Sequence, residues 1–455
     1  MPDQYGHYAD AARRCELALV HRLHSSAQAD QLLIAALSGT VVEADCHRAR
    51  LAVIDAEIRA AAVTTAVDTP TGARQFQLFL AAKTRDILGV LAETAAENRV
   101  QTVRLQQVRG GYAESEFPGI SARERDRINR QVLADDISRV EHATTAICSD
   151  DMARYENALR VRDGLASNSE DGTNPVLLLT YEPLEFGGRG RVAIAIGDPD
   201  TADNTTVLVP GARSSVRGGY LSHPDALNVY HEVSHADPDR SNSVVMWMGY
   251  RAPDSFTDPQ IAQPSSARAG GKLLADDVND LRQSHIGTGQ VTVIGHSYGS
   301  TTVADAAAGF HMHADNVVLV GSPGTDMARR AQDFHLPEGG HVYVGAASSD
   351  PITSLGGEPQ LTLPGTAATI GLGADPAADD FGSTRFKAET PGLTSPFADH
   401  GSYFTPDGES LFSIGDIASG HGDALERDHM TALHRLRSPA FDPERLRLGT
   451  GGHRH

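Results

Sequence analysis

One short segment, residues 291–308, constrains the fold of this chain more than any other. An apolar run, Val291–Ile294, leads into the pentapeptide Gly-His-Ser-Tyr-Gly at residues 295–299, and a small-residue segment that favours a helix follows at Ser300–Ala308. A strand, a sharp turn and a helix in this order are what a nucleophile elbow requires, because the turn lifts a serine hydroxyl above the edge of a sheet. The segment therefore predicts an α/β fold in which Ser297 is the nucleophile.

The turn needs small residues because it brings the backbone close to its neighbours. Gly295 and Gly299 provide that room on either side of the serine. His296 lies inside the elbow, and we expect it to pack or to form hydrogen bonds rather than to act as a second base. The alternative is an ordinary glycine-bracketed turn in which Ser297 caps the next helix. The strand and the helix that flank the turn favour the catalytic interpretation.

Apolar runs and helical segments alternate along the chain after residue 175. The predicted strands are Val176–Tyr181, Arg191–Ile196, Thr206–Val209, Val244–Met248, Val291–Ile294, Val317–Val320 and His341–Val344, with predicted helices at Ala267–Ser284 and Thr301–Phe310. The first two strands follow each other closely across a turn, which indicates an antiparallel pair. The later alternation is typical of a mostly parallel sheet flanked by helices, so we expect an α/β domain.

The first part of the chain differs in composition. Residues 5–165 are rich in Ala, Leu, Arg and Glu, and their apolar residues recur at helical spacing, which predicts four or five helices. Ser121–Glu124 reads as a capping box at the start of one of them. The apolar residues predicted to share a helix face are Phe76, Leu80, Ile87 and Leu91 in one helix and Ile128, Val132 and Val140 in another.

A polar, turn-rich stretch at residues 165–174 separates the two patterns. We therefore predict an N-terminal helical region at 1–168, an α/β-hydrolase domain at 169–448 and a disordered tail at 449–455. Pro364–Gly382 is rich in Gly, Ala, Pro and Asp, and we expect a mobile insertion there that serves either as a lid over the site or as an ordinary surface loop.

Composition and charge exclude several classes of protein. With 39 Lys and Arg against 59 Asp and Glu, the net charge is −20, which argues against nucleic-acid binding. The longest apolar stretches fall short of a transmembrane segment, and Met1–Arg14 has no apolar core like that of a signal peptide. We expect a cytoplasmic location, with export by a specialised route that needs no such signal left open.

No metal or cofactor is expected. The chain contains no His-Glu-x-x-His or Cys-rich pattern, and its three cysteines show no metal-type spacing and predict no disulfide framework. His311 and His313 lie near the end of the helix after the elbow, where a cation interacts favourably with the helix dipole. They need no metal to explain them.

A site for acyl transfer also needs N–H groups that bind the negatively charged oxygen of the tetrahedral intermediate. In this architecture one N–H comes from the residue after the nucleophile, here Tyr298, and the other from the loop after the third strand. Val207–Val209 runs into a Pro-Gly turn at that place. We expect Ala212 or Gly211 to provide the second N–H, the alternative being that Pro-Gly is simply a common turn.

The serine needs a base and an acid that orients it. In α/β-hydrolases the acid and then the histidine follow the nucleophile along the chain, on loops after later strands. Asp350 follows the predicted strand His341–Val344, and His400 follows a short candidate strand at Thr384–Thr390. We predict Asp350 as the acid and His400 as the base, with His421 as the alternative base and an ordinary Asx turn as the alternative for Asp350.

Six segments along the chain form a combination far more specific than the elbow alone. They are Ala195–Asn204, Val207–Gly211, Trp247–Pro253, Val293–Ser300, Val318–Gly324 and Ser348–Ile352. Together they resemble an actinobacterial α/β-hydrolase family that was long catalogued only as a domain of unknown function. The resemblance extends over roughly residues 120–425, and residues 1–110 match much less clearly.

The resemblance implies an α/β-hydrolase fold with Ser297 as nucleophile and Asp350 and His400 as its partners. It implies no particular substrate, because the fold and these residues suit esters, thioesters, lipids and amides alike. Relatives often carry an N-terminal helical region, sometimes similar to small helical proteins that actinobacteria export by a specialised route. This chain departs from that comparison because its single tryptophan is Trp247, so the first region has no Trp-x-Gly turn.

These observations predict a cofactor-independent serine hydrolase that acts on a carboxylic ester or related acyl bond of a small-molecule or lipid substrate. One alternative is an acyltransferase that uses the same three residues and passes the acyl group to an alcohol or amine instead of water. Another is a degenerate hydrolase scaffold that acts as a binding protein. We expect the N-terminal helices to serve packing or self-association rather than regulation.

Overall fold

The computed structural model describes residues 47–65, 69–90, 94, 121–142, 147, 149–169, 174–255, 258–357, 361–362, 369–370, 372–390, 396–437, 440–447 and 452–455. The chain forms two compact units, Met1–Phe117 and Pro118–His455. In the first unit, residues 47–64 and 70–90 are helical, and the Lys83 ammonium lies 2.6 Å from the Glu57 carboxylate. Phe76, Leu80 and Ile87 are half-buried, and Leu91 lies outside the described residues.

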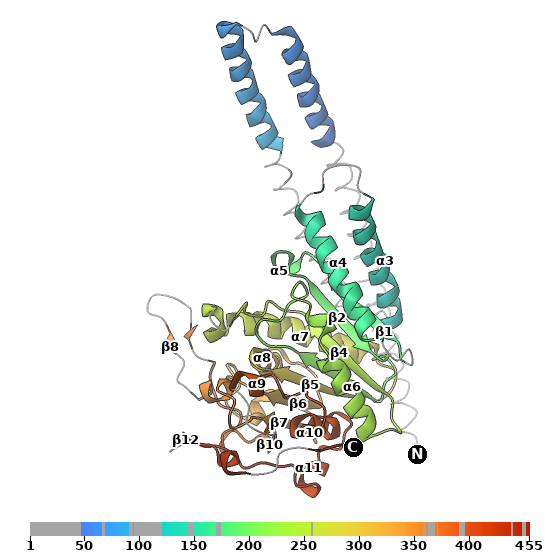
Figure 1. Cartoon of the computed structure of the whole chain (residues 1–455), viewed down its shortest axis with the longest axis vertical. Coiled ribbons are helices and arrows are strands. Elements are labelled where there is room, and N and C mark those ends of the chain that lie inside the picture. The colour runs from blue at the N-terminus through green and yellow to red at the C-terminus, as the bar shows by residue number, and fades with distance from the viewer. Residues whose placement is uncertain are drawn as a thin grey trace, which may run out of the picture. The chain divides into compact units, whose positions relative to one another are not determined.

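The second unit contains an eight-stranded sheet in the order β1-β2-β4-β3-β5-β6-β7-β10 (Figure 1). Its strands are β1 (Val176–Glu182), β2 (Arg191–Ile196), β3 (Asn204–Val209), β4 (Asn242–Met248), β5 (Gln290–His296), β6 (Asn316–Val320), β7 (His341–Gly345) and β10 (Thr384–Phe386). β2 runs antiparallel to both of its neighbours, and all other adjacent strands are parallel. The predicted mostly parallel sheet with an antiparallel pair at its start is confirmed, although β10 is shorter than the predicted run.

Helices of very different lengths precede, connect and follow these strands. The α-helices are α3 (Ala122–Glu141), α4 (Ser149–Ser167), α5 (Glu185–Gly188), α6 (Asp225–Ala236), α7 (Ser265–Ser284), α8 (Tyr298–Phe310), α9 (Pro396–His400), α10 (Glu409–Ala418) and α11 (Ala424–Arg427). The 3₁₀ helices are η1 (Tyr220–Ser222), η2 (Pro259–Ala262), η3 (Ala331–Phe334), η4 (Ile352–Leu355) and η5 (Pro443–Leu446). Two small strand pairs complete the list, β8 (Leu361–Thr362) with β9 (Thr369–Ile370) and β11 (Leu436–Arg437) with β12 (Ala440–Phe441). Within the described ranges, no helix is both long and apolar enough to cross a membrane.

Helices cover both faces of the sheet. On β4, Asn242 Nδ2 donates to Ser234 Oγ of α6 at 3.4 Å, whereas Trp247 Nε1 donates to Asp277 of α7 at 2.7 Å. Residues an odd number of positions apart on a strand point to opposite faces, so α6 and α7 lie on opposite sides. α10 packs with α6 and α8 packs with α7. The result is a buried sheet between two helical layers, which is why its strands are apolar almost throughout.

The start of α3 forms as predicted, because Ser121 Oγ accepts a hydrogen bond from the Glu124 N–H at 3.3 Å. The predicted apolar face of this helix is wrong. Ile128 and Val132 are 41% and 40% exposed, whereas Leu133, which lies outside the predicted set, is buried.

Polar contacts with β1 explain which face of α3 points toward the sheet. Asp126 Oδ1 accepts a hydrogen bond from the Leu178 N–H at 2.7 Å, and Asn129 Nδ2 donates to the Leu178 carbonyl oxygen at 2.9 Å. An edge strand offers unpaired backbone groups to whatever lies beside it. The helix therefore turns two polar side chains toward the sheet, and apolar periodicity alone mispredicts the buried face.

α3 and α4 lie in the same compact unit as the sheet. A domain boundary between residues 168 and 169 stays a prediction. In the expected tail, residues 452–455 make specific contacts: Arg454 Nη2 donates to Asp407 at 2.6 Å, and the His455 ring stacks on Phe412 with 3.9 Å between ring centroids.

The second half of the expected insertion at Pro364–Gly382 packs into the core. Leu372, Ala377 and Phe381 are buried, with 0% of Phe381 exposed. The Thr325 N–H donates to the Ala374 carbonyl oxygen at 2.9 Å and thereby ties this segment to the loop after β6. The expectation of a mobile loop is therefore wrong for residues 372–382, because apolar side chains spaced among the glycines anchor the segment. Residues 364–368 lie outside the described residues.

Candidate active site

Ser297 lies in a sharp turn between the end of β5 and the start of α8. Its φ of 55° and ψ of −130° are unusual for a residue with a side chain, and such strain is often concentrated at functional sites. A Cβ on Gly299 would come within 2.5 Å of the Pro210 carbonyl oxygen, and one on Gly295 within 2.5 Å of the Ser300 Cα. The turn can therefore form only with glycine at both positions.

Ser297, His400 and Asp350 form one chain of hydrogen bonds. Ser297 Oγ lies 2.8 Å from His400 Nε2, and His400 Nδ1 lies 2.8 Å from Asp350 Oδ2. Ser297 follows β5, Asp350 follows β7 and His400 ends α9. Because the carboxyl ends of parallel strands meet at one edge of the sheet, residues 50 and 103 positions apart along the chain come into contact. The structure thus brings together the three residues selected from the sequence.

This chain of hydrogen bonds is enclosed by protein. Only 4% of Ser297, 4% of His400 and 1% of Asp350 is exposed. Low exposure strengthens the electrostatic interaction between the carboxylate and the imidazole, because water screens it less. The arrangement can therefore hold a proton taken from the serine hydroxyl.

Asp350 has further partners. Tyr403 donates its hydroxyl hydrogen to Asp350 Oδ2 at 2.8 Å, the same oxygen that His400 contacts, and the Ile352 N–H donates to Asp350 Oδ1 at 2.9 Å. Burial and the Asp350 charge hold the pKa of Tyr403 well above its usual value, so this phenol stays protonated. Tyr403 also accepts a hydrogen bond from the Ala347 N–H at 3.1 Å. Nothing in the spacing of Tyr403 along the chain points to Asp350, so Tyr403 is not among the predicted site residues.

His296 supports His400 from the other side. Its Nε2 donates to the His400 carbonyl oxygen at 2.8 Å, and the two ring centroids are 4.9 Å apart. Burial, together with the adjacent His400, lowers the pKa of His296 to about 4. The ring is therefore neutral at physiological pH and positions the backbone, in keeping with the expected hydrogen-bonding role.

The expected oxyanion groups border Ser297. A Cβ on Gly211 would come within 2.5 Å of the Ser297 Cβ, so only glycine fits where this turn meets the serine. Tyr298 is the first residue of α8, and the N–H groups of a helix's first turn have no partner inside the helix. Neither the Tyr298 nor the Ala212 N–H donates a hydrogen bond to another described residue. Both are free to serve a ligand next to the serine.

The alternative base, His421, has other partners. Its Nδ1 lies 3.0 Å from Ser419 Oγ, and its Nε2 lies 3.6 Å from an Asp237 oxygen. The structure does not bring it to Ser297. His311 occupies the left-handed C-cap of α8. Across the described ranges, no group of three or more His, Cys, Asp or Glu side chains is arranged to hold a metal ion.

The sheet order, the antiparallel second strand and the serine turn after β5 define the α/β-hydrolase fold. Residues 187–361 match the model of an alpha/beta hydrolase family. This match and the sheet confirm the expected α/β-hydrolase family and fold. Residues 5–116 match a second model, described only as a domain of unknown function.

The chain is also similar to a curated relative and to solved structures. An uncharacterized protein of Mycobacterium tuberculosis, Rv2079, is 48% identical over 352 residues, covering 70% of this chain and 53% of the relative. The chain thus spans about half the length of that curated relative. The esterase LipW from Mycobacterium marinum is 11% identical over 61% of this chain and 91% of its own, with a TM-score of 0.35. Carboxyl esterase 2 from Tuber melanosporum is 12% identical over 56% and 87%, with a TM-score of 0.31.

Proposed function

We propose that this protein is a serine hydrolase that cleaves a carboxylic ester or a related acyl bond. The observation that carries the proposal is the unbroken chain of 2.8 Å hydrogen bonds from Ser297 through His400 to Asp350. A serine hydroxyl is a weak nucleophile unless a positioned base takes its proton. The match of residues 187–361 to the model of an alpha/beta hydrolase family supports the same reaction class.

In the proposed reaction, His400 Nε2 takes the proton from Ser297 Oγ as the oxygen attacks the acyl carbonyl carbon. The proton then passes to the leaving alcohol, which departs and leaves an acyl group on Ser297. Asp350 holds the imidazole in the required tautomer and stabilises its positive charge. Water, activated by His400, attacks the acyl-enzyme and releases the carboxylic acid. No cofactor takes part in these steps.

The N–H groups of Tyr298 and Ala212 bind the negatively charged oxygen in this proposal, with Gly211 as the alternative to Ala212. Donors of this kind favour the tetrahedral intermediate over the planar substrate, and one such donor typically contributes about 10²–10³ in kcat. α8 adds to the effect because the positive end of its dipole points at the serine turn.

Labelling with a fluorophosphonate tests the proposal directly, because this probe reacts only with an activated serine. We expect the full chain to be labelled at Ser297, as identified by mass spectrometry, and Ser297→Ala to abolish labelling. Ser402→Ala is the matched control, since Ser402 lies two positions after His400 and its hydroxyl bonds the Ala398 carbonyl oxygen. An unlabelled but folded native protein, or a label on another serine, would contradict the proposal.

A further inference from the structure

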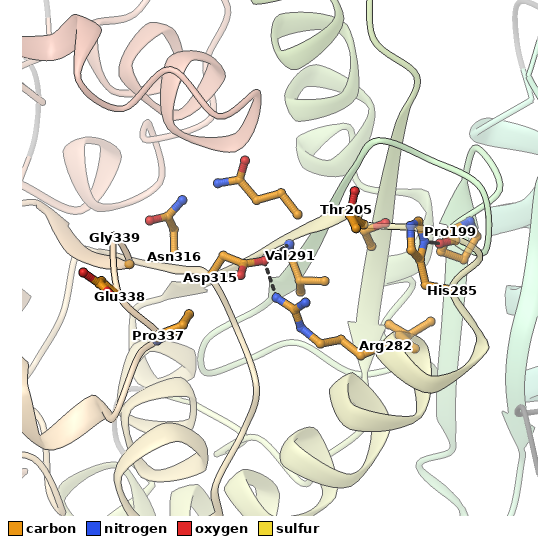
Figure 2. A pocket seen from close by; sticks show the side chains of 16 residues that line it. Pro199, Thr205, Arg282, His285, Val291, Asp315, Asn316, Pro337, Glu338 and Gly339 are labelled. Atoms are coloured by element: carbon orange, nitrogen blue, oxygen red, sulfur yellow. Dashed lines mark hydrogen bonds and ion pairs between the residues drawn. The ribbon is translucent and has the colours of Figure 1, made fainter. Parts of the chain in front are cut away.

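A cavity of the molecule lies far from Ser297. Its volume is about 550 Å³, and it lies where β3, β5 and β6 begin (Figure 2), whereas Ser297 follows the end of β5. A strand rises about 3.3 Å per residue, so the seven residues of β5 separate the cavity from the serine by roughly 20 Å. The cavity is therefore independent of the proposed hydrolase site.

Two nearly buried polar side chains line this cavity with unused hydrogen-bonding groups. Thr205 is 4% exposed, and its hydroxyl has no hydrogen-bond partner among the described residues. Asn316 is 7% exposed, and its Oδ1 accepts from the His341 N–H at 3.1 Å, while its Nδ2 has no partner in the described part of the chain. Neither atom is among the buried, unpartnered polar atoms of the described residues, so both are open to the cavity and can bond a ligand there.

More open polar groups surround these two. His285 bonds the Pro199 carbonyl oxygen through Nδ1 at 3.0 Å, which leaves its Nε2 unused by any described residue. The side chains of Gln290 and Thr288 also line the cavity. The open groups are therefore a mixture of donors and acceptors drawn from several elements, as Figure 2 shows for the labelled residues.

Charges at the cavity are either paired or exposed. Arg282 Nη2 donates to Asp315 Oδ2, and the same oxygen accepts from the Val291 N–H at 2.7 Å. The remaining charged side chain of the lining, Glu338, is exposed at the rim. An anionic ligand would meet the Asp315 and Glu338 carboxylates with no unpaired Arg or Lys on the described lining, and the whole chain carries a charge of −20. The surroundings favour a neutral ligand.

We infer that this cavity is a second binding site, for a neutral polyhydroxylated molecule such as a sugar or a cyclic polyol. Hydroxyl groups both donate and accept, so they match the mixed groups of Thr205, Asn316 and Gln290. Leu281 and Val291 supply apolar surface for the C–H faces of such a molecule. Small-molecule sites commonly have volumes of about 300–1,000 Å³, and this cavity falls within that range.

Isothermal titration calorimetry on the full chain tests the inference with glucose, maltose and myo-inositol as probes and inorganic phosphate as an anionic comparison. The key variant is Thr205→Val, which removes the open hydroxyl and keeps the shape of the side chain. Thr206→Val is the matched control: Thr206 lies next along β3, is also buried with an unpartnered hydroxyl, and points to the opposite face of the sheet.

We expect at least one neutral probe to bind, Thr205→Val to weaken its affinity by about fivefold to tenfold, the worth of one hydrogen bond, and Thr206→Val to leave it unchanged. A second variant, Asn316→Asp, keeps the oxygen that bonds His341 and removes the Nδ2 donors, so it should weaken binding too. The inference is overturned if no neutral probe binds, if phosphate alone binds, or if both threonine variants bind like the native chain. Ser297→Ala should bind the probes normally, which separates this test from that of the hydrolase.

Discussion

At the scale of single residues, Tyr403 adds a third donor to the Asp350 carboxylate beside His400 and the Ile352 N–H. A carboxylate oxygen held by two donors is fixed more firmly than one held by a single donor. Tyr403 therefore helps to hold the Asp350 oxygen that His400 contacts. His296, Asp225 and Arg435 also act electrostatically on this cluster. Tyr403 is a positioning residue in the proposed mechanism.

We predict that Tyr403→Phe lowers kcat/KM about tenfold, because the Asp350 oxygen that contacts His400 loses a donor that holds it in place. The measurement is ester hydrolysis or the rate of fluorophosphonate labelling. Tyr343→Phe, at a buried tyrosine on β7, should leave the rate unchanged. An unchanged rate in Tyr403→Phe as well would contradict a positioning role for Tyr403.

At the scale of elements, the turn between β5 and α8 depends on the close approach of β3. Gly299 lies so near the Pro210 and Val209 carbonyl oxygens that a methyl group would overlap them, at 2.5 Å from each. Backbone atoms cannot move aside as a flexible side chain does. The serine turn and the β3 turn that holds Gly211 and Ala212 are therefore one packed unit.

We predict that Gly299→Ala lowers the free energy of unfolding by more than about 2 kcal/mol, in the range of overpacked core variants, and abolishes fluorophosphonate labelling. Gly89→Ala is the matched control, because a Cβ there meets nothing within 4 Å. Gly89 lies in the helix at 70–90, where alanine is favoured by roughly 0.5–1 kcal/mol. Urea unfolding of both variants makes the comparison, and equal stability of the two would refute the packing argument.

A buried acid in α10 makes stability depend on pH. Asp416 is 6% exposed, and its Oδ2 has no hydrogen-bond partner among the described residues. Burial, with the nearby Asp428 charge, raises the pKa of Asp416 to about 6. The folded state therefore binds the proton more tightly than the unfolded chain does, so stability is lost as the pH rises through the window between the unfolded value and about 6.

We predict that Asp416→Asn is more stable than the native chain at pH 7, by up to about 3 kcal/mol, and equally stable below about pH 4. The amide keeps the shape of the side chain and removes the charge that is costly at neutral pH. Urea unfolding at both pH values gives the difference. A gain that is the same at the two pH values would show that ionisation of Asp416 is not its cause.

At the scale of the whole molecule, α3 and α4 complete the hydrolase unit. Asn157 of α4 is buried and donates to the Pro183 and Gly188 carbonyl oxygens at 2.8 and 2.9 Å, while α3 bonds both backbone groups of Leu178. These helices cover β1, the edge strand of the sheet. Removing them would expose apolar side chains and unpair buried polar groups.

We therefore predict different outcomes for two truncations. A fragment of residues 118–455 should unfold cooperatively and be labelled at Ser297 like the full chain, whereas a fragment of residues 169–455 should fail to fold. Circular dichroism melting curves and labelling yields measure both. A stable, labelled 169–455 fragment would instead support a domain boundary at 168 and 169.

The core strands and the turn at Ser297 could be predicted from the sequence because local signals mark them, whereas Asp350 and His400 were predicted from their order along the chain, with His421 left open. Apolar runs bounded by turn residues specify buried strands, and the glycines around Ser297 specify its turn. α6 also carries a readable helical signal, with Ala226, Val229 and Val233 at helical spacing. The face of α3 had no such signal, because Asp126 and Asn129 turn inward to bond an edge strand that only the fold places there.

Periodicity and short-range turn geometry are enough to predict the class of fold and the turn that holds Ser297. They also place an acid and a histidine after Ser297 in the order that acyl transfer at a serine requires. The tertiary structure decided which histidine reaches Ser297, that Tyr403 and His296 support His400 and Asp350, and that residues 372–382 are core. These contacts join positions far apart in the chain, such as His400 with Ser297 at 2.8 Å. They follow from packing between elements, and local sequence carries no information about which surfaces will meet.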